Sequence, residues 1–96
     1  MKVTGWAAGP TYGIRVGKAN RDRYFRSLSS VRVEIDKSIF EFPLAPSFWR
    51  NCPEFRSRGF GGWLRENGLA PWRKGHPPAF ELIPLGGNRF RLVRSQ

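Results

Sequence analysis

Apolar and polar side chains alternate along two neighbouring runs of the chain, Val31–Asp36 and Ile39–Leu44. Successive side chains of a strand point to opposite faces, so this period of two predicts two strands that each bury one face. The polar turn between them, Asp36-Lys37-Ser38, is short enough to fold the strands together as a β-hairpin. Because proline cannot donate to a strand ladder, Pro43 places the second strand at a sheet edge or marks its end.

Two further segments show the same alternation. Residues 80–83 and 89–93 alternate on either side of a turn at 84–88, which contains two glycines and an asparagine, and they predict a second hairpin. Residues 12–17 predict a single strand ahead of the first hairpin. Residues 1–10 show no periodicity and end in Gly-Pro, so we expect a flexible N-terminal arm there.

The region between the two hairpins has a helical period. A short turn is predicted over 47–50, and residues 60–64 place apolar side chains at positions i, i+3 and i+4. Gly68 fits the left-handed position that ends a helix, and the proline-rich linker at 71–78 prevents its continuation. Glycine weakens a helix interior by about 1 kcal/mol, so this helix should not begin before Gly61 unless packing compensates.

With 96 residues, the chain is long enough for one hydrophobic core. We therefore expect a single compact domain over residues 11–96. The predicted fold class is α+β: a mainly antiparallel five-stranded sheet or half-closed barrel, made from two hairpins and an N-terminal strand. One or two short helices lie between the hairpins, and residues 18–26 form a charged loop or a single helical turn.

The inventory of reactive side chains argues against an enzyme. Cys52 and His76 are the only cysteine and histidine, which excludes an internal disulfide and leaves too few ligands for a typical zinc site. The glutamates of the predicted strands alternate with arginines, a pattern typical of cross-strand ion pairs. We expect no catalytic residues, no metal and no other cofactor. No signal peptide or membrane span is predicted, so a cytoplasmic location and no membrane partner are expected.

Charge is the feature that points to a partner. Seventeen Lys and Arg against seven Asp and Glu give a net charge of +10, which favours a polyanion. The excess lies in the loop at 18–26 and around the helical region and its exit linker, where aromatic residues are interspersed. Guanidinium groups bind phosphate and rings stack on unpaired bases. The predicted nucleic-acid-binding residues are Lys18, Arg21, Arg23, Tyr24, Arg26, Arg56, Arg58, Trp72, Arg73 and Lys74.

The favoured hypothesis is therefore a small basic module that binds DNA or RNA. The alternative is a protein-interaction module, in which either the same basic surface docks on an acidic protein or exposed Trp49 and Trp72 serve as aromatic anchors.

Overall fold

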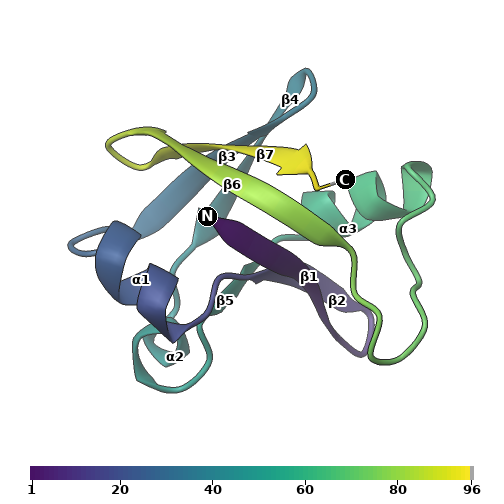
Figure 1. The fold of residues 1–96 in the computed structure, drawn as a ribbon, viewed down its shortest axis with the longest axis horizontal. Helices are drawn as coiled ribbons and strands as arrows, with labels where there is room; N and C mark the ends of the chain where they lie inside the picture. Colours follow the sequence, from purple (N-terminus) through teal and green to yellow (C-terminus); the bar gives the residue numbers. More distant parts are fainter. Residues whose placement is uncertain (96) are drawn as a thin grey trace.

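The structure, a computed structural model, describes residues 1–95. Its strands are β1 (Lys2–Ala8), β2 (Thr11–Arg15), β3 (Ser30–Ile35), β4 (Ser38–Pro43), β5 (Glu54–Arg56), β6 (Ala79–Gly86) and β7 (Arg89–Arg94), and its helices are α1 (Lys18–Tyr24), α2 (Pro46–Arg50) and α3 (Arg58–Glu66). The strands form one sheet of order β4-β3-β7-β6-β1-β2-β5, curled into a half-barrel (Figure 1). Helices α1 and α2 lie at one end of the long axis and α3 at the other.

Both predicted hairpins are confirmed. In β3–β4, Val31 faces Phe42 and Val33 faces Phe40; in β6–β7, Leu82 faces Leu92. The two hairpins join through β3 and β7, which run parallel, whereas every other strand pairing is antiparallel. The α+β class and the mainly antiparallel sheet are therefore correct.

The predicted number of strands is wrong, because the sheet has seven rather than five. One additional strand is β1, formed by residues that the sequence assigned to a flexible arm; it pairs with β2 on one side and β6 on the other. The other is the three-residue β5, within the region expected to be helical, which pairs with β2. A third helix, α1, forms where a loop or a single turn was expected.

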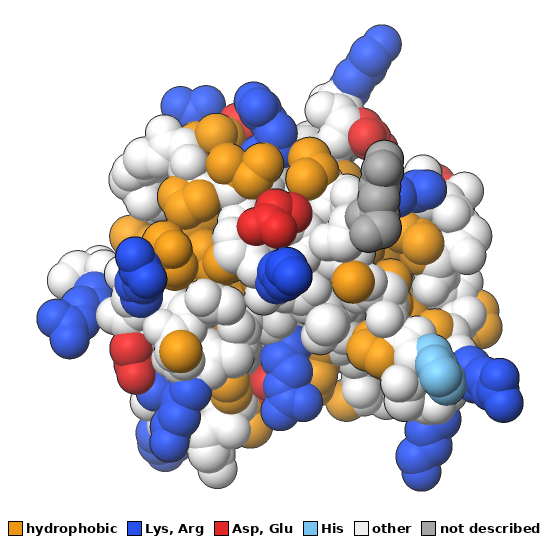
Figure 2. Space-filling model, viewed as in Figure 1, with side chains coloured by type: hydrophobic (Ala, Val, Ile, Leu, Met, Phe, Trp, Pro, Cys, Tyr) orange, Lys and Arg blue, Asp and Glu red, His pale blue; other side chains and the backbone are white. Residues whose placement is uncertain are grey.

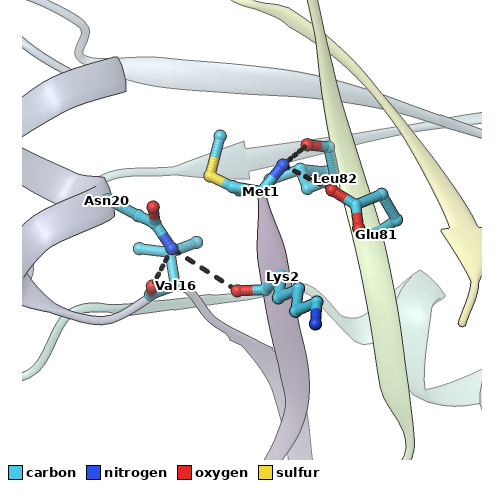
Figure 3. A network of polar contacts seen from close by, with 6 residues as sticks. All are labelled: Met1, Lys2, Val16, Asn20, Glu81 and Leu82. Carbon is cyan, nitrogen blue, oxygen red and sulfur yellow. Dashed lines mark hydrogen bonds and ion pairs between the residues drawn. The ribbon is translucent and has the colours of Figure 1, made fainter.

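Polar contacts fix the start of β1 (Figure 3). The Met1 ammonium donates to the carbonyl of Leu82 at 2.8 Å and lies 2.7 Å from a carboxylate oxygen of Glu81. The Asn20 amide of α1 donates to the carbonyl of Val16 and, at 3.4 Å, to that of Lys2. These contacts attach β1 both to the sheet and to α1.

Helix α3 begins at Arg58, three residues earlier than its glycines favour. Close packing compensates for the helix-weakening effect of two of these glycines, Gly59 and Gly61. A Cβ at Gly59 would lie 3.1 Å from the Phe40 ring, and one at Gly61 would lie 3.2 Å from the Tyr12 ring. The absence of side chains there lets the helix approach β4 and β2 closely.

The end of α3 is the predicted one. Gly68 has φ +69°, its N–H donates to Arg65, and the N–H of Leu69 donates to Leu64 at 2.8 Å. This pair of hydrogen bonds is a Schellman motif, which satisfies carbonyls that the last helical turn leaves free.

Phenylalanine dominates the core. Fully buried rings come from β-strands, from α2 and α3 and from the residue after α1: Phe25, Phe42, Phe48, Phe55, Phe60, Phe80 and Phe90. Phe25 stacks on Phe90 with 5.0 Å between ring centroids and meets Phe48 edge-on at 5.5 Å. Each buried phenylalanine stabilises the fold by about 1.5–3 kcal/mol relative to exposure. This core joins α1 and α2 to the sheet.

Candidate nucleic-acid interface

The predicted binding residues fall into two groups at different ends of the molecule. Lys18, Arg21, Arg23, Tyr24 and Arg26 lie on or just after α1, whereas Arg56, Arg58, Trp72, Arg73 and Lys74 lie beside α3 or in the segment that follows it. Figure 1 shows these two helices at opposite ends of the half-barrel, and Figure 2 shows Lys and Arg side chains in separate places around the rim and near the middle of one face. The two groups do not form one continuous surface.

Arg21 is a structural residue in this fold. Its side chain is buried at 6% exposure, and its Nη1 donates to the carbonyl of Phe48 in α2 at 3.2 Å. Its Nε donates to Asp22 at 2.9 Å. That hydrogen bond is the main cause that lowers the pKa of the Asp22 carboxyl, and the positive charges of Arg21, Arg26 and Lys18 lower it further. Arg21 therefore does not present its guanidinium to a ligand.

The other α1 cations remain at the surface. Lys18, Arg23 and Arg26 are exposed, and the Arg23 guanidinium lies 5.4 Å from the centroid of the half-buried Tyr24 ring. Asp22 stands among them and offsets part of their charge. The α1 end thus has cations that can reach solvent, but with a neighbouring carboxylate.

The other end contains a hollow lined by arginines. The hollow has a volume of about 510 Å³, and we call it the arginine pocket. Its lining residues come from the β1–β2 turn and the start of β2, from the end of β5 and the residue after it, and from α3: Pro10, Thr11, Tyr12, Arg56, Ser57, Arg58, Gly61 and Arg65. The sequence-predicted Arg56 and Arg58 meet here, and Arg65 joins them.

Two of these arginines rest on aromatic rings. The Arg56 guanidinium lies 5.3 Å from the Trp6 ring centroid, and that of Arg65 lies 5.2 Å from the Tyr12 centroid. Such contacts hold a guanidinium in place by cation–π attraction. No carboxylate among residues 1–95 lies within 4.0 Å of the Arg56, Arg58 or Arg65 guanidinium.

Glycines make both stacked arrangements possible. In the sheet, Trp6 on β1 faces Gly13 on β2, which in turn faces Arg56 on β5. Because Gly13 has no side chain, Arg56 can reach across β2 to the Trp6 ring. A Cβ at Gly13 would also collide with the Phe55 carbonyl.

Trp72 packs at the border of the pocket. Its ring meets Tyr12 edge-on, with centroids 5.4 Å apart and planes at 67°, and its edge lies over Gly5. Trp72 is half-buried, and the adjacent Arg73 and Lys74 are exposed. The ring thus supports Tyr12.

Sequence reasoning missed three members of this site: Trp6, Tyr12 and Arg65. Trp6 was assigned to the flexible arm and Tyr12 to the inner face of a strand. Arg65 follows Gly61 by four residues, the spacing that places two residues on one helix face. That spacing was the signal in the sequence that could have identified Arg65, because a glycine lets an aromatic ring approach the helix on the same face as the arginine.

The outer face of the sheet carries paired charges, as predicted. Glu34 accepts from Arg89 at 3.2 Å and lies 3.6 Å from Arg91, and Arg32 lies 3.8 Å from Glu41. Exposed pairs of this kind contribute little to stability, about 0–1 kcal/mol each. With three arginines against two glutamates the charge of this face is nearly balanced, so most of the net positive charge lies elsewhere.

Neither metal ligands nor a membrane-spanning helix is found in residues 1–95. No three His, Cys, Asp or Glu side chains lie close enough to hold a metal ion. None of the described helices has the length and hydrophobicity to cross a bilayer. Comparison of the chain with protein-family models, curated proteins and solved structures finds no match. Inference about function therefore starts from the arrangement of these residues.

Proposed function

We propose that this protein is a non-enzymatic module that binds nucleic acid, with the arginine pocket as its main phosphate contact. One observation carries the proposal: Arg56, Arg58 and Arg65 line one hollow without a carboxylate nearby. The arginines of the outer sheet face, by contrast, have glutamates beside them. Like charges held together without counter-charges repel one another, and binding a polyanion relieves that repulsion.

The chemistry of the pocket suits phosphate. A guanidinium offers a planar fork of N–H donors that matches phosphate oxygens in a bidentate geometry. Arg56 and Arg65 are already oriented by the rings beneath them, so less side-chain entropy is lost on binding. The net charge of +10 adds long-range attraction for any nucleic acid.

The test is a pair of matched triple variants in an oligonucleotide-binding assay over a range of salt concentrations. Replacing Arg56, Arg58 and Arg65 by Gln removes three charges from the pocket, and replacing Lys18, Arg23 and Arg26 by Gln removes three from the α1 end. Each bound phosphate contributes about 0.9 to the salt slope for a duplex. The pocket variant should therefore make the slope of log K against log salt shallower by about 2.7.

The α1 variant is the control for net charge. It should weaken binding less than the pocket variant does and leave most of the slope in place. Equal effects from the two variants would show that the attraction is global and that the pocket is not the contact surface. A wild-type protein that binds neither single-stranded nor duplex oligonucleotides at about 50 mM salt would refute the proposal, because electrostatic binding is strongest at low salt.

That last outcome would favour the alternative, docking on an acidic protein. Trp49 on α2 is 37% exposed, next to the exposed Arg50. Tryptophan and arginine are the residues most enriched among the dominant contacts of protein interfaces. In that case an acidic peptide should bind, and Trp49→Ala should weaken its binding more than the arginine pocket variant does.

A further inference from the structure

The arginine pocket presents exposed guanidinium groups to the solvent. Arg56 and Arg65 are exposed although each lies over a ring, Trp6 and Tyr12 respectively. A guanidinium that rests on a ring by one face keeps its opposite face free, and its N–H edges remain available as donors. The pocket therefore offers two planes for stacking as well as donors for phosphate.

The aromatic rings themselves are not the stacking surfaces. Trp6 and Tyr12 are half-buried and each has a guanidinium above it, and Trp72 packs edge-on against Tyr12. Sequence reasoning assigned base stacking to Trp72 or Tyr24. The structure makes Trp6, Tyr12 and Trp72 the support on which the two arginines are held.

Only an unpaired base can use such a plane. In a duplex the faces of the bases are stacked on one another, so a duplex shows a protein its phosphates and groove edges. Single-stranded nucleic acid exposes base faces, which stack on aromatic rings and on guanidinium planes. The pocket volume of about 510 Å³ falls in the range of small-molecule sites, about 300–1,000 Å³, which is the scale of a nucleotide.

We infer that the arginine pocket binds single-stranded nucleic acid in preference to duplex, with an unpaired base stacked on the guanidinium of Arg56 or Arg65 and an adjacent phosphate held by Arg58. This inference rests on the proposed function and names its substrate class. It assigns Arg56 and Arg65 a stacking role, which needs the flat guanidinium group as well as its positive charge. A lysine at either position would keep the charge and lose the plane.

The experiment compares the Arg56→Lys/Arg65→Lys variant with a matched control, Arg23→Lys/Arg94→Lys. The control also changes two arginines to lysine, and both lie over a ring outside the pocket: Arg23 over Tyr24 and Arg94 over Trp63. Fluorescence anisotropy measures the affinity of each protein for a mixed-sequence 12-nucleotide strand and for the corresponding 12-base-pair duplex at one salt concentration. Thermal melting of each variant checks that it is folded, and the single variants Arg56→Lys and Arg65→Lys substitute for the double variant if it is not.

The wild type should bind the single strand more tightly than the duplex. Arg56→Lys/Arg65→Lys should weaken single-strand binding at least about fivefold, the lower end of what one stacked base contributes, and change duplex binding less than about twofold. Its salt slope should equal that of the wild type, because the number of charges is unchanged. The control variant should leave the preference for the single strand intact.

Three outcomes would overturn the inference, and they differ from failure of the proposed function. In the first, the wild type binds both forms with equal affinity, and in the second it binds the duplex more tightly. In the third, the Arg56→Lys/Arg65→Lys variant loses the same affinity for both forms. Each would show that the pocket binds only the phosphates. In each of those cases the protein still binds nucleic acid and the proposed function stands. Absence of binding to either form refutes both.

Discussion

The structural role of Arg21 gives the sharpest prediction about the fold. In α2 the last carbonyls have no partner within the helix, and the carbonyl of Phe48 accepts from the buried Arg21 guanidinium at 3.2 Å. Replacing Arg21 by Ala removes this donor and leaves the buried Phe48 carbonyl without this hydrogen bond. It also removes the buried aliphatic stem of Arg21.

The expected cost follows from these two losses. A hydrogen bond from a charged donor contributes about 1.5–3 kcal/mol, and loss of the packed stem adds about 1 kcal/mol. The ion pair of Arg21 with Asp22 adds little, since the Asp22 side chain is 59% exposed. We expect Arg21→Ala to lower the free energy of unfolding by about 2–4 kcal/mol, which corresponds to a decrease in Tm of at least about 8 °C for a domain of this size.

Urea denaturation followed by circular dichroism measures the change. Arg23→Ala, an exposed substitution on the same helix, is the control and should stay within about 0.5 kcal/mol of the wild type. Arg21→Met keeps the packing without the donor, so it should recover only the packing part of the loss. The reasoning fails if Arg21→Ala is as stable as Arg23→Ala. It also fails if folded Arg21→Ala loses nucleic-acid affinity beyond what Arg23→Ala loses, because Arg21 would then contact the ligand.

Two further predictions concern single positions. Gly68→Val should lower the free energy of unfolding by on the order of 1 kcal/mol or more, because a β-branched residue is strained at φ +69°; Gly68→Asn should cost less, and a melt unchanged by valine would contradict this account of the helix end. Asp22 stabilises the fold through a lowered pKa, and this contribution is present above the ordinary aspartate value of 3.8 and lost as pH falls through the lower, folded-state value. Unfolding curves of the wild type and Asp22→Asn should therefore differ at pH 6 and converge as the pH falls well below 3.8, whereas a constant difference would show that Asp22 acts by other means.

The strands that could be predicted from the sequence are those with large apolar residues on one face. Val31, Val33 and Ile35 identify β3 without ambiguity, and all three are buried. In strand β1 burial alternates in the same way, but one of its two buried residues is Gly5, which has no side chain to give a hydrophobic signal. Trp72 and Pro78, both distant in sequence, pack on Gly5 and supply the apolar cover.

The candidate site could be predicted only in part, for a related reason. Counting charges identified Arg56 and Arg58 as members of a basic region, and the structure brings them together in the pocket. The same counting could not distinguish Arg21 from its exposed neighbours, since the difference depends on a carbonyl of α2 far along the chain. Burial of a charged side chain is decided by the partners that tertiary structure supplies.

The glycines that weaken the sequence signals are the residues that build the arginine pocket. Gly13 lets Arg56 cross β2, and Gly61 lets α3 approach Tyr12 closely enough for Arg65 to cover its ring. An interior glycine costs a helix about 1 kcal/mol, a cost that the close packing of Tyr12 offsets in α3. Fold and pocket are therefore coupled at these positions: substituting Gly61 should reduce stability and ligand affinity together, because the added Cβ displaces the ring that holds Arg65.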